Sequence, residues 1–387
     1  MAIQRIGVLT GGGDAPGLNP AIRAVVRKAA ALGIEVHGLY DGWDGLLGHP
    51  EVWKLDETIV RTWDRDGGTH LGSSRTNPFK HKVGKTTGES GGGKEARVDR
   101  SEEVLGNLKR LGLDALVPIG GEDTLGVAAR LAKLGAPVVG IPKTIDRDLG
   151  GTDYTLGFNT SLRTCAEIIE RSQTPAGSHH WVQVVEVMGR HAGHLALWSG
   201  LAGGADMILI PEHPFELSQV LRILDEKLSL GHRDRRYPRF AIVVVAEGAM
   251  PAGGKEVTVD QRIDDFGHQR LGGIGGWLAD QIRKNTQWDS RSVALGHPQR
   301  GGTPTTVDRV MGYLFGTAAV EAVMQGAWGK MVSAQGIAPA CEISLVPLEE
   351  AVKELRLVDV AKHYDTKRYY VADRVLGTGP EDVVVPR

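Results

Sequence analysis

The sequence predicts an α/β fold in which largely parallel sheets are flanked by helices. Short apolar runs such as Ala115–Ile119 and Pro137–Ile141 end in polar turns marked by glycine or proline, and a helical segment separates them. These runs lack the apolar–polar alternation of a strand with one exposed face, so they suit strands that are covered on both faces. Repeated alternation of such strands with helices is the pattern of parallel sheets.

The same pattern can be followed along the chain. Strands are expected at Arg5–Leu9, Ala115–Ile119, Pro137–Ile141, Trp181–Val187, Phe240–Ala246 and Ser292–Leu295. Helices are expected from the glycine loop after the first strand to about Leu32, between the two central strands, at Gly157–Glu170 and at about Gly272–Asn285. Residues 84–100 are polar and poor in apolar side chains, which is typical of a surface loop, a lid or an insertion.

Composition narrows the class of protein. With 387 residues, of which 41% are hydrophobic, the chain can form two domains with substantial cores. A formal net charge of −2 provides no basic field for nucleic acid or anionic lipid. Cysteine is found only at Cys165 and Cys341, and Gly11–Asp14 ends the first apolar run before a signal peptide or membrane span could form. We therefore expect a soluble cytoplasmic protein.

The two central strands lead into polar loops of a distinctive kind. Gly120–Thr124 contains two carboxylates, and Pro142–Asp148 contains two more together with a lysine. Ligands of an open parallel sheet bind beyond the carboxyl ends of its strands, where both loops would emerge. Carboxylates suit a metal ion, and glycines let backbone N–H groups approach an anion. The stretch therefore predicts a site for phosphate and metal.

A glycine loop follows the first strand at Thr10–Asn19 and leads into a helix. This arrangement directs backbone donors and a helix N-terminus at phosphate. It is not a Walker loop, because no Gly-Lys-Ser/Thr closes it, and Pro16 stands where a dinucleotide fingerprint needs its last glycine. Taken alone, the loop is either a phosphate cradle or a tight turn. Asp64–Arg75 is a second loop of glycines, hydroxyls and arginine that could hold an anion.

Seven segments together carry a family resemblance. They are TGGGDAPGLN (10–19), GGTHLGSSR (67–75), GGEDT (120–124), PKTIDRD (142–148), VVEVMGRHAG (184–193), AEG (246–248) and GHPQRGG (296–302). In this order they resemble the motif series of the phosphofructokinases. GGEDT alone is also similar to the GGDGT of NAD kinases and lipid kinases, but those families lack the other segments.

The resemblance implies a two-lobed α/β subunit with the active site in the cleft, usually in homodimers or homotetramers with shared active sites. Residues 1–157 with about 299–349 would form the lobe for the phosphoryl donor and metal. Residues 158–298 with about 350–387 would form the lobe for the sugar phosphate. No nucleic acid or membrane partner is expected.

The resemblance also implies catalytic roles, since phosphoryl transfer needs a base for the acceptor hydroxyl, a metal ion and cations on the moving charge. Asp146 matches the base that takes the proton from the sugar 1-hydroxyl, and Asp148 a carboxylate that supports the base or the metal shell. Glu122 matches the Mg²⁺ ligand, where the family usually has Asp. Arg75 matches a cation that stabilises the transition state.

The remaining matched residues are expected to bind substrate. The donor side comprises Gly12, Asp123, Thr124 and Lys143, of which Asp123 and Lys143 also belong to the expected catalytic set. The sugar-phosphate side comprises Thr144, Asp146, Met188, Gly189, Arg190, Glu247, Arg291, His297 and Arg300. Of these, Arg291, His297 and Arg300 match the clamp on the terminal phosphate, with Arg291 supplied by a neighbouring subunit.

Two positions indicate the donor. ATP-using members resemble one another in having glycine at the places of Asp123 and Lys143, whereas pyrophosphate-dependent members have the residues found here. A carboxylate at Asp123 would repel the α-phosphate of ATP, and Lys143 would supply a cation to pyrophosphate. We therefore expect reversible transfer from pyrophosphate to the 1-hydroxyl of fructose 6-phosphate, in glycolysis and gluconeogenesis. The ATP-dependent reaction is the alternative.

Two residues depart from the family pattern. Arg147 replaces an asparagine, and Trp181 replaces an arginine that reaches across the subunit interface to the terminal phosphate of the sugar. Tryptophan cannot neutralise phosphate, which leaves open a different acceptor such as sedoheptulose 7-phosphate. A sugar-phosphate sensor without activity is a third possibility, against which Asp146 and Glu122 argue.

Overall fold

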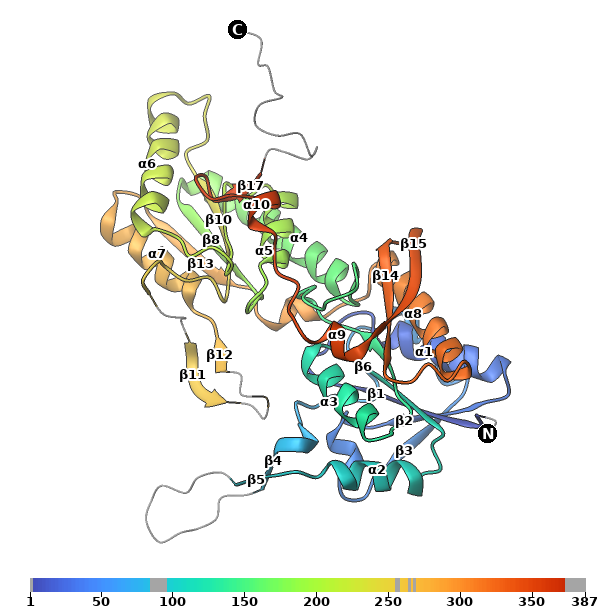
Figure 1. The fold of residues 1–387 in the computed structure, drawn as a ribbon. Coiled ribbons are helices and arrows are strands. Elements are labelled where there is room, and N and C mark those ends of the chain that lie inside the picture. The colour runs from blue at the N-terminus through green and yellow to red at the C-terminus, as the bar shows by residue number, and fades with distance from the viewer. Residues whose placement is uncertain (1–2, 84–95, 255–257, 264–265, 267–268, 373–387) are drawn as a thin grey trace. The chain divides into compact units, whose positions relative to one another are not determined.

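The chain divides into two compact units. The computed structural model describes residues 3–83, 96–254, 258–263, 266 and 269–372. Unit 1 comprises Met1–Thr164, Asp260–Arg270 and His297–Arg356, and unit 2 comprises Cys165–Val259, Leu271–Gly296 and Leu357–Arg387. Each unit contains its own sheet (Figure 1), and each is described separately below.

The sheet of unit 1 has 7 strands in the order β15-β14-β7-β6-β1-β2-β3. Their bounds are β1 Arg5–Thr10, β2 Glu35–Leu39, β3 Val52–Leu55, β6 Ala115–Gly120, β7 Val139–Pro142, β14 Lys330–Ile337 and β15 Ala340–Pro347. The five inner strands are parallel, and the two edge strands β3 and β15 pair antiparallel with their neighbours. The carboxyl ends of β1, β6 and β7 therefore meet at one edge.

Helices cover both faces of this sheet and create two cores (Figure 1). Helices α1 (Leu18–Ala31) and α8 (Thr306–Met324) pack on one face, where Ile22, Val25 and Phe315 are buried. Helices α2 (Ser101–Arg110), α3 (Glu122–Lys133) and α9 (Leu348–Ala351) contribute to the core on the other face. Burial on both faces explains why the central strands are continuously apolar.

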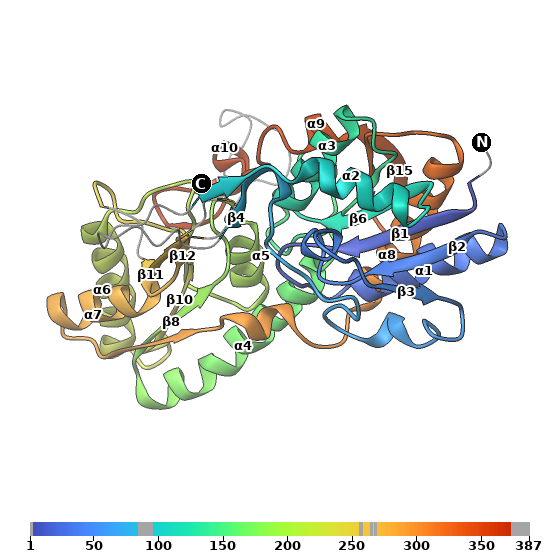
Figure 2. The same ribbon diagram turned by 90° about the horizontal axis from the view of Figure 1, so that it is seen from below.

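Unit 2 contains a smaller sheet of 4 strands, all parallel, in the order β13-β8-β10-β9. Their bounds are β8 Val182–Val187, β9 Met207–Leu209, β10 Ala241–Ala246 and β13 Ser290–Ala294. Helices α6 (Leu217–Arg233) and α7 (Ile274–Asn285) lie on one face, and α5 (His194–Ala202) lies on the other with α4 (Phe158–His179) (Figures 1 and 2). Short elements complete the described chain: β4 His81–Val83, β5 Ala96–Val98, β11 Thr258–Ile263, β12 Gln269–Leu271, α10 Val360–His363, β16 Tyr364–Asp365 and β17 Tyr370–Val371.

The predicted α/β class is confirmed, and all six predicted strands are present with ends shifted by no more than a few residues. Two details of the prediction were wrong. Helix α4 continues to His179 instead of ending at Glu170. Ala96–Val98, expected in a polar loop, forms β5 and pairs antiparallel with β4, while 84–95 lies outside the described residues. The edge strands β3 and β15 were not predicted.

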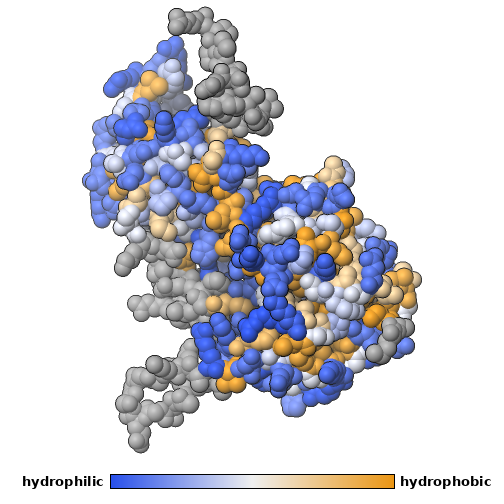
Figure 3. Space-filling model, viewed as in Figure 1, coloured by the Kyte–Doolittle hydropathy of each residue, from blue (hydrophilic) through white to orange (hydrophobic). Residues whose placement is uncertain are grey.

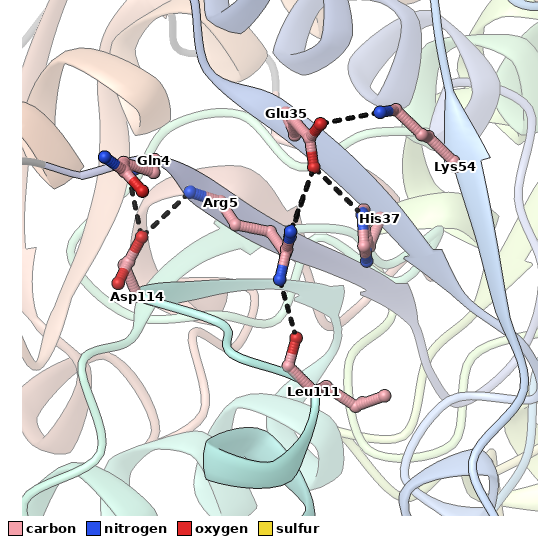
Figure 4. A network of polar contacts seen from close by, with 7 residues as sticks. All are labelled: Gln4, Arg5, Glu35, His37, Lys54, Leu111 and Asp114. Carbon is pink, nitrogen blue, oxygen red and sulfur yellow. Dashed lines mark hydrogen bonds and ion pairs between the residues drawn. The ribbon is translucent and has the colours of Figure 1, made fainter.

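A polar network closes the amino ends of the strands in unit 1 (Figure 4). Asp114 accepts hydrogen bonds from the backbone N–H groups of Gln4 and Arg5, at 2.7 and 2.9 Å. Glu35 pairs with Lys54 at 2.6 Å and with Arg5 at 3.2 Å, and these hydrogen bonds lower the pKa of its carboxyl. The network joins the starts of β1 and β2, at the edge opposite to the expected site.

The face seen in Figure 3 is mainly hydrophilic, with apolar residues interspersed among polar ones. Among the residues that the structure describes, no helix has both the length and the apolar character needed to cross a membrane.

Helices α1 and α8 pack so closely that a methyl group would not fit between them. A Cβ at Gly316 would lie 2.5 Å from the carbonyl oxygen of Ala21, whereas a Cβ at Gly106 in α2 would meet nothing within 4 Å. We expect Gly316→Ala to destabilise the protein by about 1–3 kcal/mol through overpacking. The matched Gly106→Ala should stabilise it by roughly 0.5–1 kcal/mol, because alanine is the better helix former. Thermal melting of both variants tests the pair; a higher melting temperature for Gly316→Ala would contradict the packing argument.

Candidate active site

The glycines of the loop after β1 allow a positive φ and close contacts with neighbouring side chains. Gly12 has φ 77°, and its N–H donates to the carbonyl of Ser74 at 2.9 Å. A Cβ at Gly11 would lie 2.6 Å from Oγ1 of Thr124, and one at Gly13 would lie 2.6 Å from a guanidinium nitrogen of Arg300. The absence of Cβ atoms therefore lets the loop backbone lie directly against Thr124 and Arg300.

A polar pocket of about 630 Å³ opens beside this loop. Its lining combines backbone from two glycine-rich loops with hydroxyl and cationic side chains: Gly12, Gly13, Asp14, Gly67, Gly68, Thr69, Ser73, Ser74, Arg75, His297 and Arg300. Hydroxyls, backbone N–H groups and two arginines are the donors that bind phosphate oxygens. The sequence had indicated Gly12, Arg75, His297 and Arg300; it had not singled out Thr69, Ser73 or Ser74, although all three lie in the second glycine-rich loop.

Lys143 is buried at the base of the glycine loop, with 3% of the residue exposed. Its Nζ donates to the carbonyl oxygen of Gly11 at 3.0 Å and also to that of Gly13. The pKa of Lys143 is lowered to about 7, mainly by burial and also by the charges of Arg300 and Arg75, while Asp14 opposes the shift. Three cationic side chains thus converge on one loop, which is an electrostatic arrangement that an anion would stabilise.

Three carboxylates, Glu122, Asp146 and Asp148, lie close enough to influence one another electrostatically. Glu122 is the first residue of α3, and Asp146 and Asp148 lie in the loop after β7. Burial raises the pKa of Asp148 to about 7, and the charges of Asp146 and Glu122 contribute in the same direction. Within the described structure, Oδ1 of Asp148 is buried and accepts no hydrogen bond. This crowding of negative charge favours a cation or a proton at the site.

A magnesium ion fits these residues in a specific way. Among the described residues, no group of three or more His, Cys, Asp or Glu side chains forms a ready metal site. Mg²⁺ is commonly held by one or two carboxylates and completed by substrate phosphates and water. Glu122 and its neighbouring carboxylates meet the first requirement, and bound phosphate and water would supply the remaining ligands.

Asp123 follows Glu122 in the first turn of α3 and borders a second pocket of about 340 Å³. Arg130 and Phe266 also line this pocket, and the guanidinium of Arg130 lies 3.6 Å from the ring centre of Phe79. Glu122 lines the same pocket, so both carboxylates border this partly apolar hollow.

In unit 2, the loops after β8 and β10 are bound to each other. The N–H of Glu247 donates to the carbonyl of Val187 at 2.8 Å, and the N–H of Gly248 donates to that of Gly189 at 3.0 Å. A Cβ at Gly248 would lie 1.8 Å from the carbonyl oxygen of Arg190. Met188, Gly189, Arg190 and Glu247 are thus brought together at the carboxyl edge of the sheet.

Arg291 lies at the other end of the same sheet. It pairs in register with Gln183, at the start of β8, whereas Arg190 follows the end of that strand. Gln183 and Val187 are four residue steps apart along the strand, a distance of about 13 Å. Within one subunit, unit 2 therefore does not bring Arg291 to the loop of Met188–Arg190.

Trp181 lies directly beside Arg291. The guanidinium carbon of Arg291 is 5.4 Å from the Trp181 ring centre, and the indole stacks on His179 at 5.1 Å. The indole N–H donates to Oε1 of Gln183 at 3.1 Å. Trp181 thus forms an aromatic support for Arg291, an arrangement worth roughly 0.5–1 kcal/mol at an exposed site.

Residues 5–323 match the sequence profile of the family described as Phosphofructokinase. The chain belongs to this family.

Three known proteins illustrate how similar the chain is to others in sequence and in fold. A pyrophosphate–fructose 6-phosphate 1-phosphotransferase of Amycolatopsis mediterranei is 50% identical over 375 residues, 95% of this chain and 100% of that one. An ATP-dependent 6-phosphofructokinase of Chloroflexus aurantiacus is 46% identical over 355 residues, 92% of this chain and 93% of that one. The solved pyrophosphate-dependent phosphofructokinase of Marinobacter aquaeolei, 21% identical, shares the fold with a TM-score of 0.77 over 96% of this chain and 89% of that one.

The lowered pKa of Lys143 predicts a pH dependence of anion binding. Because its pKa is about 7 in the unliganded protein, the ammonium that an anion needs is present below pH 7 and is lost above it. Pyrophosphate, used as a probe, should therefore bind with uptake of a proton, and its affinity should fall by up to about tenfold per pH unit above 7 relative to a variant without the lysine. Calorimetry of the parent and Lys143→Met across pH 6–9 measures this difference; parallel profiles for the two proteins would contradict it.

Proposed function

We propose that the protein transfers a phosphoryl group reversibly between pyrophosphate and the 1-hydroxyl of fructose 6-phosphate. The observation that carries this proposal is the Lys143 ammonium, held against the carbonyls of Gly11 and Gly13 beside the polar pocket. Four curated relatives of 45–50% identity are named for this reaction. The ATP-dependent name of another relative at 46% identity makes ATP the alternative donor.

Pyrophosphate is proposed to bind against the glycine loop. The loop at Gly12 and the neighbouring Thr124 would line its site, while Lys143 and Arg75 would neutralise charge on its phosphates. During transfer, charge spreads over the moving phosphoryl group, and fixed cations stabilise it without reorganisation. Asp123 would disfavour ATP by repelling the additional phosphate.

Glu122 is proposed to hold a magnesium ion with the support of Asp148. When bound, the ion would neutralise charge on the donor phosphates. The charges of Asp146 and Glu122 act on Asp148 and contribute to its raised pKa, so the three carboxylates would share the electrostatic influence of the ion.

Asp146 is proposed to take the proton from the sugar 1-hydroxyl. Its backbone N–H donates to Oγ1 of Thr144 at 3.1 Å, which fixes the turn that presents both residues. On the sugar side, Met188, Gly189, Arg190 and Glu247 would contact the sugar phosphate, with His297 and Arg300 on its terminal phosphate. Unit 1 would act as the donor lobe and unit 2 as the sugar-phosphate lobe.

Arg291 is proposed to reach the terminal phosphate from a neighbouring subunit. Its place at the start of β13 supports this, because the sugar-binding loops of unit 2 follow the opposite ends of the strands. The active protein would then be a homodimer or homotetramer in which each site needs two subunits.

Replacing the base tests the reaction chemistry. Asp146→Asn keeps the shape of the side chain and removes its basicity, so turnover should fall by ~10²–10⁴, the usual span for a lost general base. Binding of fructose 6-phosphate, measured by calorimetry, should change little. Turnover within a few-fold of the parent would show that another group takes the proton.

The donor assignment is tested by a pair of substitutions. The parent should have a higher kcat/KM with pyrophosphate than with ATP. Asp123→Gly combined with Lys143→Gly should narrow or reverse this preference, because the repelling carboxylate and the extra cation are both removed. Steady-state kinetics with both donors on both proteins measures the change. Efficient use of ATP by the parent would refute the pyrophosphate assignment.

A further inference from the structure

Asp308 is a buried carboxylate, outside the groups assigned so far, whose hydrogen-bonding capacity is filled. It lies in the first turn of α8 with no exposed surface. Its Oδ1 accepts from the hydroxyl of Tyr154 and the N–H of Gly157, both at 2.7 Å. Its Oδ2 accepts from the N–H and hydroxyl of Thr160, at 2.8 and 2.5 Å. Removing a partner from such a group is costly, because the charge stays buried.

The four donors all belong to one segment, 154–161, which Asp308 therefore holds in a single conformation. Burial raises the pKa of Asp308, and the hydrogen bonds from Thr160, Gly157 and Tyr154 oppose that shift. Gly157 has φ 95°, and a Cβ there would lie 2.5 Å from the Cβ of Ala15 in the glycine loop. The segment is thus held by hydrogen bonds to Asp308, and at Gly157 it packs against Ala15 of the glycine loop.

The same segment reaches the loop of the proposed base. The N–H of Leu156 donates to the carbonyl of Pro142 at 3.1 Å. The hydroxyl of Thr155 donates to the carbonyl of Thr144 at 2.7 Å. Because Thr144 in turn binds the N–H of Asp146, only two hydrogen bonds separate Thr155 from the backbone of the base.

A second contact of the segment reaches the turn that carries His297 and Arg300. The hydroxyl of Ser161 donates to the carbonyl of Gln299 at 2.7 Å. Gln299 is fully buried between these two residues of the polar pocket. Thr155 and Ser161 thus extend from one segment to two different parts of the candidate site.

We propose that Asp308 is a positioning residue for phosphoryl transfer, which acts through segment 154–161 to align the loop of Asp146 with the turn of His297–Arg300. This inference rests on the proposed function, since it assigns catalysis to the first loop and phosphate binding to the second. A misplacement of about 1 Å can reduce turnover by about 10²-fold. The two contacts should therefore affect different kinetic parameters.

Two mild substitutions separate the contacts. Thr155→Val removes the hydroxyl that holds Thr144 and nearly preserves the volume, so kcat should fall by about 10–100-fold with KM for fructose 6-phosphate within about twofold. Ser161→Ala releases the carbonyl of Gln299, so the same KM should rise by about 3–10-fold with kcat within about twofold.

Matched controls lie on the same helix. Ser172 and Ser178 donate to carbonyls of α4 outside segment 154–161, at 2.7 and 2.9 Å, so Ser172→Ala and Ser178→Ala should leave both parameters at the values of the parent. Asp308→Asn, with Tyr154→Phe as a gentler change, should alter kcat and KM together, and melting temperatures show how far each variant remains folded.

Kinetics are measured with the donor that the parent prefers. An incorrect donor assignment then shows in the parent, whereas an incorrect positioning role shows in the ratios of variant to parent. A lower kcat in Thr155→Val together with a higher KM in Ser161→Ala supports the inference. Unchanged kinetics with a lowered melting temperature, or the same response from both variants, would overturn it.

Discussion

The buried Lys143 ammonium is the interaction on which the candidate site depends. It follows β7 and donates to carbonyls of the loop after β1, while the N–H of Gly11 in that loop donates to Ile119 of β6 at 3.0 Å. The ends of three neighbouring parallel strands are thereby joined. A buried cation among carbonyl oxygens is destabilised by burial and by nearby arginines, so an anion in the adjoining pocket would relieve an existing electrostatic strain.

In the unit 1 sheet, the polar groups at the amino ends of the strands stabilise the fold, whereas those at the carboxyl ends line the candidate site. At the amino edge, Asp114 accepts a hydrogen bond from the backbone N–H of Arg5, and the Arg5 side chain forms an ion pair with Glu35. These contacts align the starts of the strands (Figure 4). At the carboxyl edge, the polar groups are instead directed at loops and a pocket. A sheet aligned at one edge can present loops at the other with little backbone adjustment, which is the condition for preorganised catalysis.

The contacts of Trp181 in unit 2 suggest a reason for tryptophan at this position other than the loss of a phosphate contact. The indole lies under the guanidinium of Arg291 and stacks on His179. A second guanidinium at this position would repel Arg291, whereas the aromatic ring attracts it. The indole and the carboxylate of Asp289, 3.2 Å from Arg291, together hold this cation at the start of β13.

The sequence by itself determined the α/β class, the six strands and the loops that carry the candidate site, because these depend on local apolar patterning and on glycines that no other residue can replace. The motif series likewise indicated Lys143, Asp146 and Glu122 as candidate site residues. Tertiary structure decided what depends on distant pairing: the edge strands β3 and β15, the contact of Lys143 with the glycine loop, and the stacking of Arg291 on Trp181. Asp308 shows the reason most clearly. Its partners lie about 150 residues away along the chain, and no local propensity records which distant donors will fill the oxygens of a buried carboxylate.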